Sequence, residues 1–171
     1  MHASAAILLV EDNEIETALL RRAFSTIGST ISLEHVWDGE EALRLLSSVA
    51  RVPDLVITCI NLPKFDGLIL LEKLKGMKAT RSIPVAILTN SEREEDRVKA
   101  FDSGAAGYFI KPTDGAGYDR LVRTVATYAL AIRRKRDRQP TDLREPSKGV
   151  AAGLPGFVPP LGTRHAELPE T

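Results

Sequence analysis

The sequence predicts an α/β protein built from five alternating strand–helix units. Three observations predict this fold class: short apolar runs, amphipathic segments between them, and connections of only a few residues. Strands and helices that alternate in this way form a parallel sheet with helices on both faces. Ligand sites in such sheets lie at the carboxyl ends of the strands, so we expect the functional residues there.

The first two units show the pattern. The continuous apolar run from Ala5 to Val10 is typical of a strand that is covered on both faces. A helix follows, and Gly28 ends it. Ile31 to Val36 alternates apolar and polar residues, as a second strand does. Asp38 with Glu41 three residues later predicts a capping box at the start of the next helix.

The other three units follow the same order. A third strand, Asp54 to Cys59, is preceded by Pro53 and ends at a loop over residues 60–67. A helix follows, with Leu68, Leu71 and Leu74 on one face. The remaining elements are strands at 84–89 and 107–111 and helices at 94–103 and about 119–138.

Composition and charge exclude several classes of protein. The 171 residues include 23 basic and 23 acidic ones, and a net charge of zero argues against whole-molecule attraction to nucleic acid or an anionic membrane. No apolar run approaches the ~18 residues that span a bilayer, and no basic region precedes the first apolar stretch. We therefore expect neither a membrane span nor a signal peptide. The single cysteine, Cys59, cannot form an internal disulfide, which favours a cytoplasmic location.

The chain divides near residue 139. Residues 1–138 contain all the predicted strands and helices and form the expected domain, with an extended last helix. Residues 139–171 hold six of the ten prolines and four of the twelve glycines, which predicts a flexible tail. The alternative is a linear motif at Leu154–Leu161 that docks as an extended peptide in an aromatic groove.

Five short motifs occur in order along the predicted domain: Leu9–Asn13, Pro53–Ile57, Asn61–Gly67, Ile87–Thr89 and Tyr108–Pro112. In this order and spacing, over about residues 5–134, the chain resembles the receiver domain of bacterial two-component response regulators. The resemblance implies the flavodoxin-like fold, a doubly wound five-stranded parallel sheet in the order 2-1-3-4-5.

The resemblance also implies a phosphorylation site. In the family, an aspartate at the end of the third strand takes a phosphoryl group from a sensor histidine kinase, and acids after the first strand hold Mg²⁺. Glu11 and Asp12 match these acids, and Asn61 matches the position whose backbone carbonyl is a metal ligand. Cys59 stands at the phosphoacceptor position, so the aspartate is missing.

Three further residues match functional positions of the family. Thr89 matches the hydroxyl and Lys111 the cation that contact the phosphoryl oxygens, and Tyr108 matches the aromatic residue that changes rotamer on activation. Each also has a structural interpretation: a strand-end hydroxyl, an ion pair with the acids Glu11 and Asp12, and a packed aromatic ring. The two acids can equally cap the first helix.

A cysteine changes the chemistry expected at position 59. Mg²⁺ prefers oxygen ligands and an acyl phosphate needs a carboxylate, so we expect weakened Mg²⁺ binding and no phosphorylation there. The acids Glu11 and Asp12 raise the pKa of the thiol and Lys111 lowers it, and the sequence does not decide which effect prevails. We expect a buried, space-filling Cys59. The alternatives are a redox-sensing thiol, phosphorylation of the thiol or another side chain, and an introduced substitution.

The last predicted helix offers a surface for self-association. Its apolar residues recur at steps of four, three and four: Leu121, Val125, Tyr128 and Ile132. We expect a homodimer through this seam, and the alternative is that the seam covers the domain's own core. The basic run Arg133–Arg138 is favoured by the helix dipole and does not indicate nucleic-acid binding.

Together these features predict a stand-alone receiver protein that is not an enzyme and acts by protein contact. The expected partner is a sensor histidine kinase or another signalling protein. The loop at residues 61–64 and the extended last helix resemble stand-alone regulators of phytochrome-type kinases. Two alternatives remain, a regulator phosphorylated on another acceptor and a Cys59 redox sensor.

Overall fold

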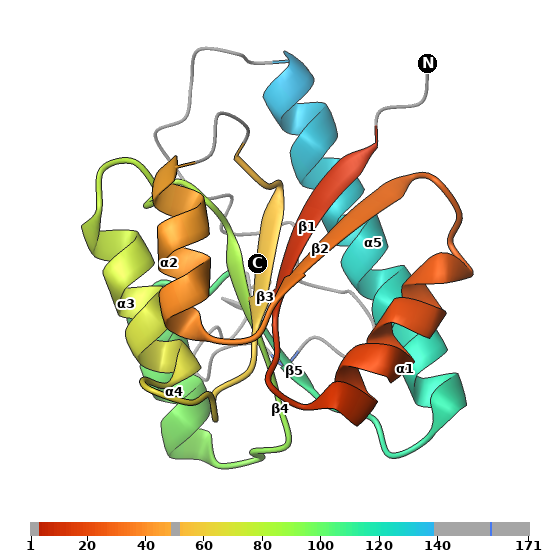
Figure 1. The fold of residues 1–171 in the computed structure, drawn as a ribbon, viewed down its shortest axis with the longest axis horizontal. Helices are drawn as coiled ribbons and strands as arrows, with labels where there is room; N and C mark the ends of the chain where they lie inside the picture. Colours follow the sequence, from red (N-terminus) through yellow and green to blue (C-terminus); the bar gives the residue numbers. More distant parts are fainter. Residues whose placement is uncertain (1–3, 49–51, 139–157, 159–171) are drawn as a thin grey trace, which may run out of the picture.

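A computed structural model describes residues 4–48, 52–138 and Val158. Its five parallel strands form one sheet in the order β2-β1-β3-β4-β5, which confirms the predicted fold (Figure 1). The strands are β1 (Ala5–Val10), β2 (Ile31–Val36), β3 (Leu55–Thr58), β4 (Val85–Thr89) and β5 (Gly107–Ile110). The helices are α1 (Glu14–Ser25), α2 (Gly39–Ser48), α3 (Gly67–Gly76), α4 (Glu94–Asp102) and α5 (Gly115–Arg138).

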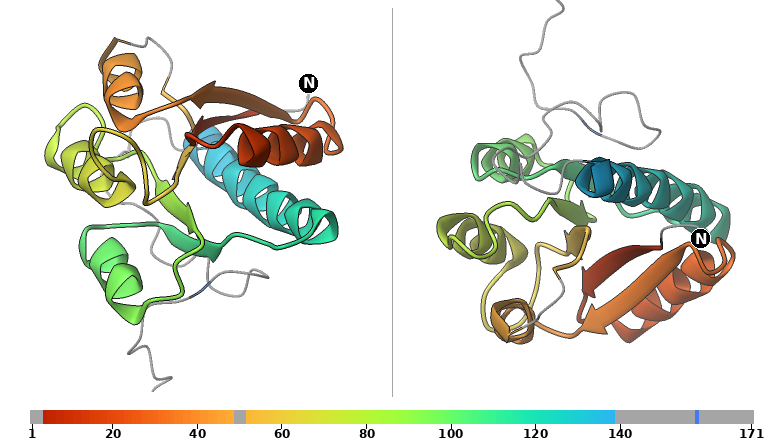
Figure 2. Two further views of the ribbon diagram at one scale, coloured as in Figure 1. Left: turned by 60° about the horizontal axis from the view of Figure 1, so that its bottom comes forward. Right: turned by 90° about the horizontal axis from the view of Figure 1, so that it is seen from above.

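Helices cover both faces of the sheet (Figure 2). Because side chains alternate across a strand, Ile7 and Leu9 of β1 join one core cluster with α1 and α5. Leu8 and Val10 of the same strand join a second cluster with α2, α3 and α4. Both faces of β1 are therefore buried, as the continuous apolar run predicted.

The helix starts show where local sequence and structure agree. The amide of Glu41 donates to the Asp38 carboxylate at 2.8 Å, which is half of the predicted capping box. The Glu41 carboxylate accepts from the Trp37 amide at 2.9 Å rather than from that of Asp38. The last helix begins at Gly115, before the predicted start near 119. The amide of Gly117 donates to the Asp114 side chain at 2.6 Å, and this cap outweighs the low helix propensity of glycine.

The apolar seam of α5 lies inside the molecule. All four of its residues belong to the core cluster that α5 forms with α1 and the sheet: Leu121, Val125, Tyr128 and Ile132. Packing within the chain accounts for the seam, which was the alternative to a dimer contact. A partner helix could reach these side chains only if α5 left the sheet, so this seam is not an exposed dimer surface. Homodimerisation itself stays a prediction.

The far end of α5 is held by an ion pair. Nη1 of Arg136 lies 2.9 Å from Oδ1 of Asp54, whose side chain is fully buried beside the start of β3. The other carboxylate oxygen of Asp54 accepts from the Ala6 amide at 2.8 Å. Arg136 also donates to the carbonyls of Val52 and Pro53, each at 3.3 Å. One residue of the basic run thus has a structural role.

No helix within the described residues is long and apolar enough to cross a membrane. The predicted flexible tail lies outside the described residues apart from Val158.

Replacement of Arg136 by glutamine is expected to lower the free energy of unfolding by about 2–3 kcal/mol. The change leaves the buried Asp54 carboxylate without its cation. Because the Arg136 side chain is a quarter exposed, the lost stability is smaller than for a fully buried ion pair. Urea unfolding measures the effect. Arg134→Gln makes the same change at an exposed residue of the same turn and should cost less than about 0.5 kcal/mol. Equal effects would contradict the proposed ion pair.

Candidate functional site

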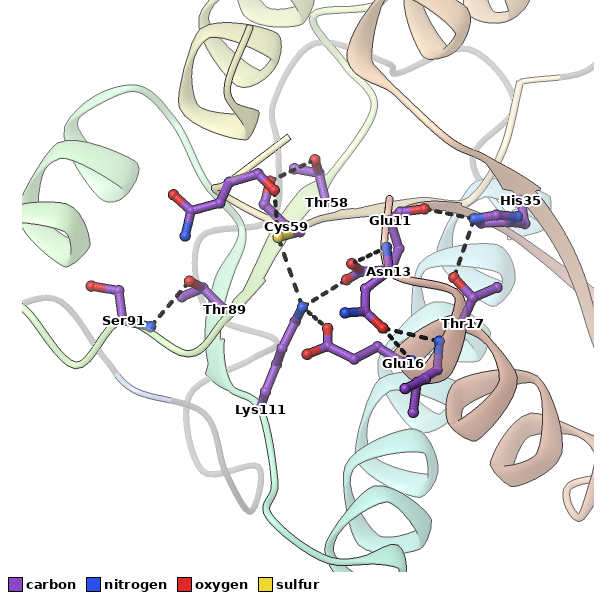
Figure 3. A network of polar contacts seen from close by, with 12 residues as sticks. Glu11, Asn13, Glu16, Thr17, His35, Thr58, Cys59, Thr89, Ser91 and Lys111 are labelled. Carbon is purple, nitrogen blue, oxygen red and sulfur yellow. Dashed lines mark hydrogen bonds and ion pairs between the residues drawn. The ribbon is translucent and has the colours of Figure 1, made fainter. Parts of the chain in front are cut away.

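The polar residues at the strand ends meet at one edge of the sheet. Glu11 and Asp12 follow β1 and Cys59 follows β3, and one potential ligand atom from each of the three lies within 4.8 Å of the others. Lys111 follows β5 and points into the same pocket, while Thr89 ends β4 beside it (Figure 3). The structure therefore brings together residues that the sequence places up to 100 positions apart.

The Lys111 ammonium is the centre of the pocket. Its Nζ lies 2.7 Å from Oε2 of Glu11 and forms a second ion pair with Glu16. It is also 3.8 Å from Sγ of Cys59 (Figure 3). Only 4% of the Lys111 side chain is exposed. A buried cation is stable when its donors are satisfied by charged acceptors, and two carboxylates provide that here.

Burial and pairing act in opposite directions on this cluster. Burial raises the pKa of the Glu11 carboxyl above its usual range, although the hydrogen bond from Lys111 opposes the shift. Burial would lower the pKa of Lys111, but hydrogen bonds to Glu11 and Glu16 prevail and raise it. Lys111 therefore stays charged throughout the physiological range.

The thiol of Cys59 is protonated at neutral pH. Burial, followed by the nearby Glu11 carboxylate, raises its pKa to about 11, although Lys111 opposes the shift. This settles the question that the sequence left open between the acids and the lysine. The sulfur donates to the backbone carbonyl of Asn61 at 3.4 Å. A protonated thiol is a poor nucleophile and a poor metal ligand.

The donor set fits Mg²⁺ only in part. Carboxylates of Glu11 and Asp12 are the oxygen ligands that Mg²⁺ prefers, but the third side-chain donor is the Cys59 sulfur. The Asn61 carbonyl already accepts from that thiol, and Glu11 is paired with Lys111. A magnesium ion would have to compete with both contacts for its ligands.

The predicted switch residues lie on the β4–β5 side of the pocket. The Tyr108 ring is buried, and its hydroxyl donates to the carbonyl of Ser91 at 2.9 Å. The amide of Ser91 in turn donates to Oγ1 of Thr89 at 3.1 Å. Ser91 thus links Tyr108 to the end of β4.

Two residues of the site are not apparent from its motifs. Glu16 lies in the first turn of α1, where an acid is expected for capping, and the structure turns it toward Lys111. The side chain of His35 lies beside Glu11, and its Nε2 is 2.8 Å from the Glu11 backbone oxygen. The register that pairs His35 with Leu9 places it there. An acid one turn into α1 and a histidine near the end of β2 are the available sequence signals.

A glycine brings α3 against the acceptor position. A β-carbon on Gly67 would lie 1.8 Å from the carbonyl oxygen of Cys59, well inside van der Waals contact. The Gly67 amide also donates to the carbonyl of Ile60 at 2.7 Å. The start of α3 therefore holds the backbone of Cys59 in place.

The sequence matches the response regulator receiver domain family over residues 7–124. It is similar to the probable methanogenesis regulatory protein FilR2 of Methanothrix harundinacea, at 36% identity over 132 residues that cover 75% of this chain and 85% of that protein. It is also similar to the response regulator PleD of Caulobacter vibrioides, at 31% identity over 161 residues. That match covers 94% of this chain but 34% of PleD.

Solved structures of regulators share the fold. The phosphorylated cyanobacterial phytochrome response regulator RcpA has a TM-score of 0.70 and 29% identity, over 75% of this chain and 96% of that one. The Mn²⁺-bound response regulator Rcp1 has a TM-score of 0.67 and 27% identity, over 74% and 94%. The bacteriophytochrome response regulator AtBRR has a TM-score of 0.62 and 30% identity, over 75% and 94%.

Gly67→Ala is expected to destabilise the protein by at least about 1–3 kcal/mol, because the added methyl group meets the Cys59 backbone. Urea unfolding measures the loss. Gly76→Ala is the matched control at the other end of α3, where nothing lies within 4 Å of the added carbon. It should be neutral or stabilising by up to about 1 kcal/mol. A stable Gly67→Ala variant would contradict the close approach.

Alkylation of Cys59 by iodoacetamide is expected to accelerate about tenfold per pH unit from pH 7 to 10. The reason is that a thiol with a pKa of about 11 stays protonated through this range. Intact mass against time gives the rate, and glutathione in the same buffers gives the behaviour of an ordinary thiol. Circular dichroism confirms that the fold persists at each pH. A rate that levels off below pH 9 would contradict the raised pKa.

Proposed function

The chain belongs to the response regulator receiver domain family, and on that premise we propose that it is an atypical stand-alone regulator in two-component signalling. It accepts no phosphoryl group at the usual position and acts by binding another protein. The observation that carries the proposal is the protonated thiol of Cys59 at the end of β3, held between Asn61 and Lys111. Phosphoryl transfer needs a nucleophile there, and the neutral thiol is a weak one.

The ion pairs of Lys111 support the same conclusion. In the family this lysine contacts phosphoryl oxygens, whereas here its ammonium is shared by the carboxylates of Glu11 and Glu16. A phosphoryl group would have to displace Glu16 or repel it at close range. The Lys111 ammonium therefore already has two anionic partners without phosphorylation.

Mg²⁺ binding is weak under this proposal. Two carboxylates give the ion a partial site, and the response regulator Rcp1, whose fold the chain shares, has a Mn²⁺-bound form. The third carboxylate is missing, and sulfur is a poor substitute for oxygen with this ion. We expect the affinity of the Cys59→Asp variant for Mg²⁺ to be higher than that of the unmodified protein.

The proposed partner is a sensor histidine kinase or another signalling protein. Receiver domains interact with such proteins, and one similar sequence is part of the sensor histidine kinase CheAY of Helicobacter pylori. The solved neighbours include phytochrome and bacteriophytochrome response regulators. We propose no enzymatic activity, and the described residues include no second domain that would bind nucleic acid.

A redox-sensing role for Cys59 has less support. Reactive sensor thiols have a low pKa and are accessible to oxidants. Cys59 is 6% exposed and its pKa is raised to about 11. Both properties slow its oxidation.

Incubation with acetyl phosphate and Mg²⁺ is expected to phosphorylate Cys59→Asp and leave the unmodified protein unchanged. The variant restores a carboxylate nucleophile in a pocket that still holds Glu11, Asp12, Thr89 and Lys111. Intact-mass spectrometry measures the added phosphoryl group. Cys59→Asn is the matched control, because asparagine has the shape of aspartate but no carboxylate. This variant should stay unlabelled.

One outcome contradicts the proposal, and a second contradicts its explanation through Cys59 alone. Labelling of the unmodified protein would show that it is phosphorylation-competent, and peptide mapping would then identify the acceptor. Failure of Cys59→Asp to gain a phosphoryl group would show that the pocket has lost more than its nucleophile.

A further inference from the structure

β5 is an edge strand of the sheet. On this side of the molecule, beside α4, the C-terminal stretch makes a contact that lies outside the pocket around Lys111. Within the described residues, β5 pairs with β4 on one side and with no strand on the other. Exposed edges of this kind are usually shortened, charged or covered by another segment. Partly buried apolar side chains lie along this side on α4, on the turn after it and on β5: Phe101, Ala105 and Ile110.

Val158 makes the contact. Its amide donates to the backbone carbonyl of Tyr108 on β5 at 3.1 Å. Its side chain packs against the core cluster on that face of the sheet, which includes Tyr108 of β5 and Ala100 of α4. A residue from the C-terminal stretch therefore binds the edge of the sheet through one hydrogen bond and one apolar contact.

The sequence around Val158 suits a single anchor. Pro159 and Pro160 follow it, and proline has no backbone N–H, so neither can extend the hydrogen bonding along β5. Pro155 precedes it within the Leu154–Leu161 motif, whose prolines favour an extended backbone before binding.

The connection is long enough for the same chain to supply the anchor. Twenty positions separate Val158 from Arg138 at the end of α5. A flexible chain of this length would have a root-mean-square end-to-end distance of roughly 25 Å. The effective concentration of a tethered segment is then on the order of millimolar, so even a weak contact is populated.

We propose that Val158 anchors the C-terminal stretch to the molecule's own α4–β5 face, and that this contact competes with partner proteins for that face. It releases the face when a partner competes for it. The docking itself does not depend on the chemistry at Cys59. Hydrogen bonds do connect the α4–β5 face with the pocket. The Tyr108 hydroxyl donates to the Ser91 carbonyl, and the Ser91 amide donates to Oγ1 of Thr89. Docking of the segment therefore also restrains the strand that carries Tyr108.

Amide hydrogen exchange of the full chain tests the proposal. The amide of Val158 is expected to exchange at least tenfold more slowly than that of Val150, which has the same side chain in the same stretch but no such partner in the proposal. Because Pro159 and Pro160 carry no amide, Val158 is a clean reporter at its end of the motif. Exchange at the intrinsic rate for both valines would overturn the docking.

Two variants assign the contact to this segment. Val158→Asp should accelerate exchange several-fold in α4 and β5 without changing exchange in β1 and β3, and Val150→Asp should change neither. Val158→Pro removes the N–H that donates to Tyr108, and also replaces the side chain and fixes φ, so it too should accelerate exchange in α4 and β5. No change in α4 and β5 for Val158→Asp would overturn the proposal.

Dilution separates the same chain from a second copy. Protection of the Val158 amide should be unchanged when the protein is diluted a hundredfold below its working concentration. Protection that disappears on dilution would overturn the assignment to the same chain and place the segment on a neighbouring molecule.

Discussion

The ion pair between Lys111 and Glu11 is the interaction on which the pocket depends, because it joins the residue after the last strand to the residue after the first. One hundred positions separate them in the chain, and their charged atoms are 2.7 Å apart. Both side chains are buried, so the Glu11 carboxylate depends on Lys111 for its charge partner, and Lys111 depends on Glu11 together with Glu16. The strand order puts β3 and β4 between β1 and β5, and the long lysine side chain crosses their ends.

The state of Cys59 follows from the same burial. The buried lysine lowers the pKa of the thiol, but desolvation and the Glu11 carboxylate outweigh it. A cysteine among charged groups is therefore a neutral hydrogen-bond donor to Asn61. This neutral thiol is the basis of our proposal that the protein signals through its surface rather than through a covalent intermediate.

Sequence reasoning succeeded where local pattern and environment agree. The apolar run of β1 and the bond between Glu41 and Asp38 are examples, since each depends on neighbours in the chain. It was less successful for α5. A helical seam through Tyr128 and Ile132 shows that one face is apolar, but not whether a partner or the chain's own sheet covers it. The structure places the chain's own core there.

The sequence by itself determined the alternating elements, their order along the chain and the polar residue types at the strand ends, because these depend on periodicity and short-range chemistry. Only the tertiary structure decided which groups pair. Glu16 reaches Lys111, Arg136 reaches Asp54 and Val158 reaches Tyr108. These contacts join distant parts of the chain, and burial decides their charges, so no local pattern can specify either.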